Sequence, residues 1–319
     1  MLPNECASHL AGGASAFVKN AQMTATILNG STLADTIKKR LATKIAAIRE
    51  SSGQVPGLAY LLADEGPVSK HYVAGKSKAC QAVGMTSFVE PFPPDIPEEK
   101  LLRRIDELNV RADVHGILVQ FPLPTQVNLH HVVERIDPQK DVDGFHPYNR
   151  GLLFSSHTAI VPCTPKGIIT LLKENKISME GKRTVILGRS LVVGRPLLML
   201  FLNENATVTV CHQKTRDLES ITKTAEILVA AVGRPKFVKK KHVAPGAVVI
   251  DVGVHQVAGK LVGDVDFDEV ATVAKAITPV PGGVGPMTVA TLLENTFDAF
   301  QKSMMSRGKL ERVPPRADR

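Results

Sequence analysis

Apolar side chains recur at helical spacing early in the chain. They lie three or four residues apart and include Leu33, Ile37, Leu41, Ile45 and Ile48. This spacing predicts a helix with one buried face, which we expect to end at Gly53. The pattern then predicts, in turn, a strand, a helix, a strand, a helix and a strand, over residues 58–62, 69–83, 85–89, 98–108 and 116–121. Such alternation is typical of a mostly parallel sheet.

The same alternation returns after residues 122–165, a stretch that we expect to be rich in loops. Further strands are predicted over residues 184–187, 207–211, 227–231 and 248–252. A last amphipathic helix, residues 287–300, has no strand after it and is expected to pack back on the first domain. The pattern therefore predicts an α/β fold in which two α/β domains with mostly parallel sheets flank a cleft, the second domain being of Rossmann type.

Domain boundaries follow from where the periodic pattern starts and stops. We expect a disordered extension, a first domain built from two segments, a second domain and a frayed tail. These parts cover residues 1–22, residues 23–155 plus 286–305, residues 156–285 and residues 306–319, respectively.

Composition narrows the classes of function. The chain has 319 residues, of which 44% are hydrophobic, but no apolar stretch approaches the roughly 20 residues that span a bilayer, so we expect no membrane partner. The net charge of +8 raises the question of nucleic acid. However, the basic residues are dispersed, Trp is absent and there are only three Tyr, so we expect no nucleic-acid partner. Positive charge equally suits a small polyanion such as a dinucleotide phosphate.

The four cysteines lack the paired short spacing of zinc sites and redox dithiols, so we expect no metal site. A reducing compartment, the cytoplasm, fits this usage best. A mitochondrial location is the alternative. The first 22 residues argue against it, because they contain Glu5 and their only Lys or Arg is Lys19.

A glycine turn between a predicted strand and helix, residues 183–196, is a candidate pyrophosphate site. Gly188 matches the first glycine of the usual fingerprint, whereas Ser190 and Val193 replace the second and third and Gly194 comes one place late. An ordinary turn from strand to helix therefore remains an alternative.

The end of the next strand bears on cofactor preference. Sites for NAD place an acid there to bind the ribose hydroxyls, but this chain continues with His212, Gln213 and Lys214. Arg189, directly after the turn glycine, suits a 2′-phosphate instead. The sequence favours NADP over NAD.

Tyr72 and Lys76 share a face of one predicted helix at i, i+4 spacing, and Gln120 lies at the carboxyl end of a predicted strand. A surface lysine and a half-buried tyrosine are the alternative. Short-chain dehydrogenases also use a Y-x-x-x-K pair, but there it follows the dinucleotide turn, whereas here it precedes the turn by more than a hundred residues.

Two further segments are candidates for ligand contact. Residues 140–145 (KDVDGF) place Asp141 and Asp143 on either side of Val142, although a plain D-G turn is the alternative. Residues 278–288 (TPVPGGVGPMT) hold three prolines and three glycines, a rigid and bare backbone that a ligand could approach closely. An interdomain hinge is the alternative for this segment.

Six strings occur together and in one order: PVSKHYVAGKSKA, HGILVQFPLP, KDVDGF, ILGRSLVVGRP, DVGV with VGDVDF, and TPVPGGVGPMT. This combination resembles the bifunctional methylenetetrahydrofolate dehydrogenase/cyclohydrolases, over about residues 24–302. The resemblance implies a catalytic folate-binding domain completed by the C-terminal helix, an NADP-binding Rossmann-type domain, and a homodimer formed through the cofactor domains.

The resemblance also assigns roles to residues. It makes Lys76 the catalytic lysine, with Tyr72 against the pterin and Gln120 holding the amine, and Asp143 the acid that binds the pterin ring. The proposed backbone wall near the substrate includes Pro281, Gly282 and Gly283. The cofactor contacts would come from Gly188, Arg189, Ser190, Gly194, His212 and Gln213, with Arg189 on the 2′-phosphate.

Two departures from the family pattern stand out. Leu62-Ala63-Asp64 replaces the usual Val-Gly-Asp, and Gln213 stands where mammalian relatives have a serine toward the 2′-phosphate.

The implied activity has two steps. The enzyme would oxidise 5,10-methylenetetrahydrofolate to the 5,10-methenyl compound with NADP, then hydrolyse it to 10-formyltetrahydrofolate, with Lys76 as general base. No step needs a metal. A monofunctional dehydrogenase and a folate-binding protein without catalysis are the alternatives, and the chain length speaks against a fused synthetase domain.

Overall fold

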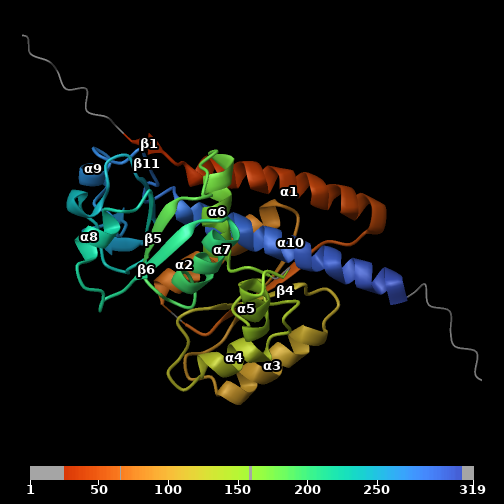
Figure 1. Ribbon diagram of the computed structural model, residues 1–319. Helices are drawn as coiled ribbons and strands as arrows, with labels where there is room; N and C mark the ends of the chain where they lie inside the picture. The colour runs from red at the N-terminus through yellow and green to blue at the C-terminus, as the bar shows by residue number, and fades with distance from the viewer. Residues whose placement is uncertain (1–24, 65, 158–159, 311–319) are drawn as a thin grey trace, which may run out of the picture.

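The structure is a computed structural model that describes residues 25–64, 66–157 and 160–310 (Figure 1). The extension predicted over residues 1–22 lies outside the described residues. Two parallel sheets, each covered by helices, confirm the predicted α/β class and the Rossmann type of the second domain. Among the described helices, none combines the length and apolar character that crossing a membrane requires.

The larger sheet has six parallel strands in the order β1-β11-β8-β7-β5-β6. Their bounds are β1 Thr26–Ile27, β5 Arg183–Leu187, β6 Thr207–Cys211, β7 Ile227–Ala230, β8 Val248–Asp251 and β11 Ala276–Ile277. The chain runs outward from β5 to β6 and then returns to β7 on the other side of β5. This reversal makes the carboxyl ends of β5 and β7 the topological switch point, where open α/β sheets bind ligands.

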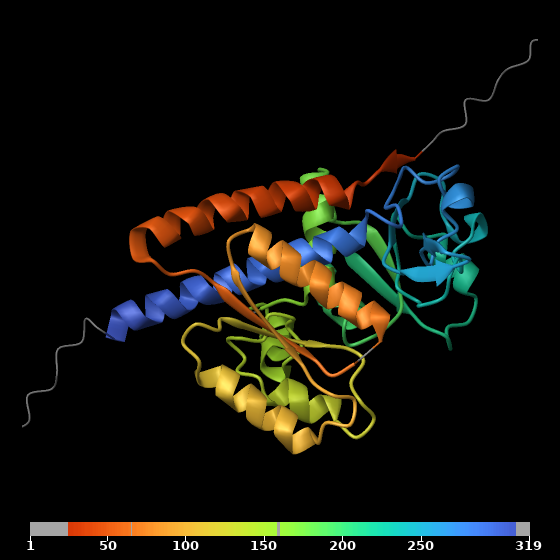
Figure 2. The same cartoon turned by 180° about the vertical axis from the view of Figure 1, so that it is seen from behind.

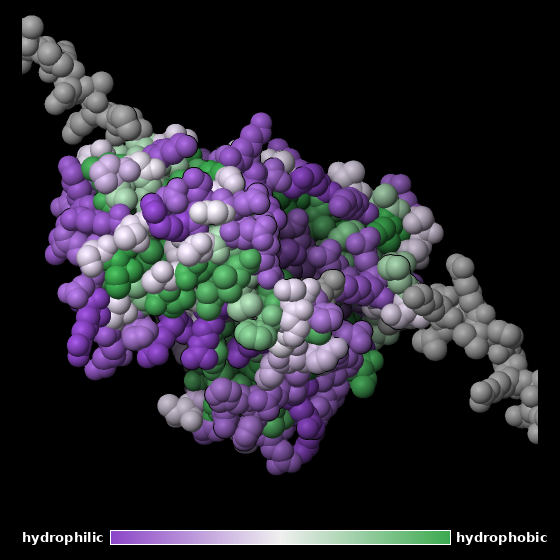
Figure 3. All heavy atoms as spheres, in the orientation of Figure 1, coloured by the Kyte–Doolittle hydropathy of each residue, from purple (hydrophilic) through white to green (hydrophobic). Residues whose placement is uncertain are grey.

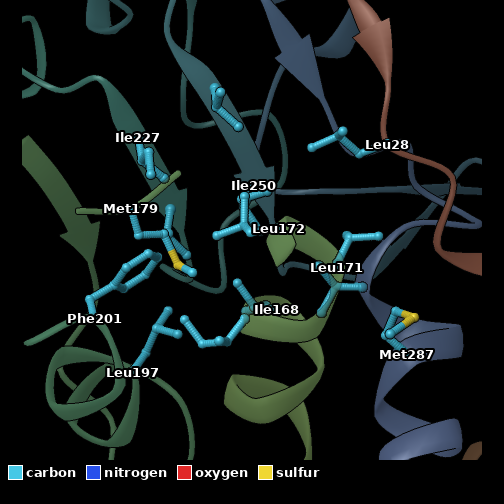
Figure 4. Close-up of a cluster of buried hydrophobic side chains, with 14 of the residues drawn as sticks. Leu28, Ile168, Leu171, Leu172, Met179, Leu197, Phe201, Ile227, Ile250 and Met287 are labelled. Atoms are coloured by element: carbon cyan, nitrogen blue, oxygen red, sulfur yellow. The ribbon is translucent and has the colours of Figure 1, made fainter. Parts of the chain in front are cut away.

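Helices pack on both faces of the larger sheet, and a hairpin extends from it. The helices are α6 Cys163–Glu174, α7 Gly194–Asn203, α8 Leu218–Thr222, α9 Phe267–Val270 and the 3₁₀ turn η1 Lys240–His242. The hairpin pairs β9 His255–Val257 with β10 Lys260–Val262. Figure 4 shows the core on the α6 and α7 side, in which Leu197 and Phe201 lie on one side of Ile250 and Leu171 lies next to Met287 on the other.

The smaller sheet has three parallel strands in the order β3-β2-β4, namely β3 Thr86–Pro91, β2 Gly57–Leu62 and β4 Gly116–Gln120. Every residue of β2 is buried, and successive side chains alternate between two cores. Ala59 and Leu61 face α3 Glu98–Val110 and α4 Leu129–Arg135. Leu58 and Tyr60 face α2 Pro67–Ala82 and the two longest helices.

These two longest helices, α1 Gly30–Ser52 and α10 Val284–Leu310, connect the sheets and lie side by side (Figure 2). α10 places Met287 in the core beside the larger sheet and Phe297 and Phe300 in the core beside the smaller one. The last helix therefore packs against the cores of both sheets. α1 ends at Gly53, whose φ of +69° is the left-handed conformation that closes many helices.

Several elements differ from the prediction. The stretch 122–165 contains α4, α5 Pro147–Phe154 and the start of α6, because helices of about two turns carry little periodicity. β1 joins the larger sheet, although it belongs to the segment predicted for the first domain, and two residues are too few to form a pattern. α10 continues to Leu310 through the first residues of the predicted tail, since no proline interrupts the sequence before Pro314. The predicted domain boundaries themselves stay a prediction.

Candidate active site

Lys76 and Gln120 form the centre of the site. The Nζ of Lys76 on α2 donates a hydrogen bond of 3.0 Å to Oε1 of Gln120, the last residue of β4. The Nε2 of Gln120 donates to the carbonyl of Phe121 at 2.8 Å, which fixes the amide with its oxygen toward the amine. Tyr72, one turn earlier on α2, is 48% exposed. The structure therefore brings Lys76 and Gln120 together as the sequence suggested and leaves the Tyr72 ring accessible.

The start of α2 is fixed by Asp64, which follows β2. Its carboxylate accepts hydrogen bonds from the backbone N–H of Gly66 at 2.9 Å and from the hydroxyl of Ser69. These hydrogen bonds lower the pKa of Asp64, and the one from the Ser69 hydroxyl has a larger effect than the one from the Gly66 amide. The neighbouring strands β2 and β4 pair Leu62 with Gln120, so this turn sets the position of α2 relative to Gln120.

Asp143 lies in a half-buried position within the electrostatic field of Lys76. Burial raises the pKa of Asp143 to about 6, while the Lys76 amine works in the opposite direction and the nearby Asp141 carboxyl adds to the rise. A carboxyl with this pKa is mostly ionised at pH 7 and can still take up a proton in weak acid. The site thus places one acid near one amine.

Asp141, the other acid of the KDVDGF segment, holds the turn that presents Asp143. Its buried carboxyl accepts from the backbone N–H of Phe145 at 3.1 Å, from that of His146 at 2.8 Å, and from the Nδ2 of Asn149 at 2.9 Å. Gly144 has a φ of +69°, and a Cβ there would lie 2.6 Å from the backbone nitrogen of Pro162. The D-G turn is real, and the Asp143 carboxyl takes no part in the hydrogen bonds that Asp141 makes within it.

Two residues that support Asp143 were not predicted from the sequence. The thiol of Cys163 donates to the carbonyl of Val142 at 3.3 Å and lies 3.7 Å from Oδ1 of Asp143. Asn295 of α10 donates from Nδ2 to the carbonyls of Val142 and Val161, both at 2.9 Å. A polar residue on the buried face of an amphipathic helix was the available signal for Asn295, because buried polar groups almost always have partners.

The proline and glycine segment lies where α1 and α10 begin. Pro281 is exposed, and Gly282, with a φ of +102°, accepts a hydrogen bond of 2.9 Å from the backbone N–H of Ser31. Gly283 is buried, and a Cβ on Gly30 would lie only 1.9 Å from its carbonyl oxygen. Close packing against α1 therefore explains why Gly282 and Gly283 are glycines. Of these residues, Pro281 is exposed and Gly283 is buried, so only part of the segment is open to a ligand.

The predicted cofactor turn has the geometry of a close backbone approach. Gly188, directly after β5, has a φ of +118°, and a Cβ there would lie 2.2 Å from the carbonyl oxygen of Ala231. A Cβ on Gly194 would lie 2.2 Å from the carbonyl oxygen of Gly188. The hydroxyl of Ser190 accepts from the N–H groups of Val193 at 3.1 Å and Gly194 at 3.4 Å, next to the start of α7. The bare turn before a helix N-terminus fits a pyrophosphate.

The remaining predicted cofactor residues lie beside this turn. The N–H of Gly188 donates to the carbonyl of Cys211 at 2.9 Å, so the ends of β5 and β6 are adjacent. His212 and Gln213 follow Cys211, with Gln213 exposed like Arg189. Figures 1 and 2 both place α2, which carries Lys76, next to the part of the larger sheet formed by β5 and β6.

Comparison with known proteins identifies the family. Residues 28–143 match the family model described as the catalytic domain of tetrahydrofolate dehydrogenase/cyclohydrolase, and residues 162–304 match its NAD(P)-binding domain. The bifunctional protein FolD of Geobacillus thermodenitrificans is 51% identical over 281 residues, which cover 88% of this chain and 99% of that protein.

Solved structures give the same result. The bifunctional FolD enzyme of Campylobacter jejuni is 44% identical, with a TM-score of 0.85 over 87% of this chain and 99% of that one. The Trypanosoma brucei enzyme, solved with NADP and an inhibitor, is 38% identical, with a TM-score of 0.85 over 88% of this chain and 99% of that one. The chain belongs to the tetrahydrofolate dehydrogenase/cyclohydrolase family.

Proposed function

We propose that this chain oxidises 5,10-methylenetetrahydrofolate with NADP and hydrolyses the methenyl product to 10-formyltetrahydrofolate in one shared cleft. The observation that carries the proposal is the hydrogen-bonded Lys76–Gln120 pair near the Asp143 carboxyl, in a chain that also holds the glycine turn. A spectrophotometric assay of the purified protein tests it. NADPH should form with methylenetetrahydrofolate, and supplied methenyltetrahydrofolate should disappear faster than in buffer alone.

The dehydrogenase step depends mainly on positioning. NADP, when bound, accepts a hydride from the methylene carbon of the folate. The protein contributes by holding the two reactants in a near-attack geometry, which needs no proton transfer. Tyr72, half-exposed on α2, can cover one face of the pterin, and the outward backbone of Pro281 and Gly282 can form a wall. Gly283 supports that wall from behind.

The cyclohydrolase step needs a base. Water attacks the methenyl carbon and loses a proton as the new bond forms, which calls for an acceptor close by. Lys76 is that acceptor in our proposal, because its Nζ is held by Gln120. The positive charge of the methenyl compound itself disfavours a second positive charge on the amine, so the substrate helps to create the base.

Asp143 anchors the pterin ring in both steps. Its ionised carboxyl accepts hydrogen bonds only, which suits the N–H donors at the edge of a pterin. Asn295 and Cys163 both donate to the carbonyl of Val142 and so hold the backbone directly before Asp143.

The 2′-phosphate of NADP would lie at the end of β6. The three residues after β6, His212, Gln213 and Lys214, include no acid. No carboxylate there would bind the ribose hydroxyls or repel a 2′-phosphate. Arg189 is exposed beside the glycine turn and would pair with the phosphate, with His212 and Gln213 lining the same edge.

The assembly we propose is a homodimer formed through the larger sheet. β6 ends the strand order of that sheet among the described residues. Figure 3 shows an apolar surface over β6 and α7, to which Leu202, 45% exposed, and the partly buried Val208 and Val210 belong. An apolar sheet edge of this kind is a template for pairing with a second copy.

A cytoplasmic location is also our proposal. The described cysteines, Cys80, Cys163 and Cys211, are free thiols, as is usual in a reducing compartment. Cell fractionation would test it.

A further inference from the structure

A second buried carboxyl, Asp264, lies on the cofactor side of the molecule, apart from the Lys76 site. It is fully buried and accepts four hydrogen bonds. Oδ2 accepts from the backbone N–H groups of Val232 at 2.6 Å and Gly233 at 3.0 Å. Oδ1 accepts from the N–H of Arg234 at 2.9 Å and from Nε2 of His255 at 2.8 Å.

This set of four donors is specific for a carboxylate. Three successive backbone N–H groups that converge on one point form a concave anion site, which here is filled by a side chain of the same protein. An ionised carboxyl has two oxygens and no donor, so it can satisfy all four donors. An asparagine would replace one oxygen with an NH₂ group that faces two donors, although its size is nearly the same.

The carboxyl of Asp264 is itself held rigidly. Asp251, at the end of β8, accepts from the backbone N–H groups of Asp264 at 2.8 Å, Val265 at 3.0 Å and Gly253 at 3.1 Å. A Cβ on Gly253 would lie 2.4 Å from Cγ of Asp264, and one on Gly263 would lie 1.8 Å from Oδ2 of Asp251. Each of the two carboxyls therefore packs directly against backbone at a position where a Cβ would collide with it.

The loop that Asp264 holds follows β7 at the topological switch point. It begins at Ala231, whose carbonyl oxygen packs against Gly188 of the cofactor turn. A dinucleotide whose pyrophosphate lies at that turn continues across the carboxyl ends of the strands, so its second half passes over the end of β7. Because the N–H groups of residues 232–234 point inward to Asp264, the loop has one fixed backbone shape at this place.

We propose that Asp264 is a positioning residue for hydride transfer: it fixes residues 231–234 as the wall against which the nicotinamide half of NADP lies, and His255 completes its hydrogen bonds. The inference rests on the proposed dehydrogenase function and deepens it. The cyclohydrolase step uses Lys76 on α2, beside the smaller sheet, and needs no nicotinamide. A change at Asp264 should therefore affect the two activities differently.

The test is Asp264→Asn in the full-length protein, with both activities measured on one preparation. The dehydrogenase is assayed while NADP is varied, and the cyclohydrolase with methenyltetrahydrofolate supplied directly and without NADP. We expect dehydrogenase kcat/KM for NADP to fall about 10- to 100-fold, the usual effect of misplacing a reactant by about 1 Å. The cyclohydrolase should stay within about twofold of the parent.

Asp266→Asn is the matched control. Asp266 is two residues further along and pairs with Lys239 at 2.5 Å and Lys236 at 3.7 Å, but it holds none of the N–H groups of residues 232–234. Both activities should survive in this variant. If Asp264→Asn does not fold, His255→Ala removes one of the four hydrogen bonds and should show a smaller loss of the same kind, which His255→Gln, with its own N–H donor, should partly restore.

The outcomes separate the two proposals. An equal fall of both activities, or an unchanged dehydrogenase in folded Asp264→Asn protein, would overturn the positioning role. A parent protein without any NADP-dependent dehydrogenase activity would instead overturn the proposed function.

Discussion

Folding and ligand binding favour opposite protonation states of Asp143: folding favours the protonated carboxyl, and the proposed binding of the pterin uses the ionised one. Its pKa of about 6 in the folded protein lies above the value near 3.9 of an unfolded chain. The folded state therefore binds this proton more tightly than the unfolded state does. The resulting stabilisation is complete below about pH 4 and is lost as the pH rises through 6. At pH 7 the ionised Asp143 carboxyl therefore lowers the free energy of unfolding.

Asp143→Asn should remove this pH dependence. Two pKa units correspond to about 3 kcal/mol at most, so the free energy of unfolding of the parent should fall relative to that of the variant between pH 4 and 7. Urea unfolding at several pH values measures this difference. Asp251, whose pKa is raised to about 7 by burial, contributes equally to both proteins and cancels. Parallel pH profiles for the two proteins would contradict the assignment.

Arg189 determines the preference for NADP over NAD in the proposed function. Arg189→Ala should weaken NADP much more than NAD, because the guanidinium pairs with a phosphate that NAD lacks. A charge-assisted contact contributes about 1.5 to 3 kcal/mol, or roughly 10- to 150-fold in kcat/KM for NADP. Arg103→Ala on α3, where Arg103 pairs with the exposed Glu99, is the control and should change the affinity for neither cofactor. Equal losses with NADP and NAD would refute the role of Arg189.

Among the elements, α10 contributes side chains both to the candidate site and to the two hydrophobic cores.

The long helices and the buried strands were predictable from the sequence, because many residues contribute to each periodic pattern. Short elements such as β1, α4 and α5 were not, since each is held by tertiary contacts. The same limit applies to side chains. Lys76 and Gln120 occur in recognisable contexts, whereas Asn295 and Asp264 act on backbone groups more than 25 residues away, and no local pattern encodes those partners.

Asn295→Ala tests whether α10 positions the pterin site. The change removes the Nδ2 group that donates to the carbonyls of Val142 and Val161, although the Cys163 thiol still donates to Val142, and it should lower the free energy of unfolding by about 1 to 3 kcal/mol. The KM for the folate should rise in both activities, because Asp143 follows Val142 directly. Gln301→Ala, exposed on the same helix, should change neither quantity. A destabilised variant with an unchanged KM would show that Asn295 serves stability alone.

At the scale of the whole molecule, the apolar surface over β6 and α7 should join two copies. Leu202→Glu places a charge within it and should shift the protein from dimer to monomer in sedimentation velocity. Val110→Glu makes the same change at an apolar residue that is 84% exposed at the end of α3, and it should leave the dimer intact. A monomeric parent, or a dimer that persists in Leu202→Glu, would contradict the proposed interface.

In our proposal one cleft performs two chemically different steps, and only one of them uses Lys76 as a base. Lys76→Met keeps much of the side-chain volume and removes the amine, while Lys78→Met on the exposed side of the same helix is the control. Both activities should be measured on one preparation, with methenyltetrahydrofolate supplied directly for the second and thermal unfolding compared with the parent.

Cyclohydrolase turnover of Lys76→Met should fall about 10²- to 10⁴-fold, the usual contribution of general acid–base catalysis, and dehydrogenase turnover should fall much less. Lys78→Met should retain both activities. An undiminished cyclohydrolase in folded Lys76→Met protein would contradict the mechanism, and an equal collapse of both activities would make Lys76 a positioning residue instead of a base.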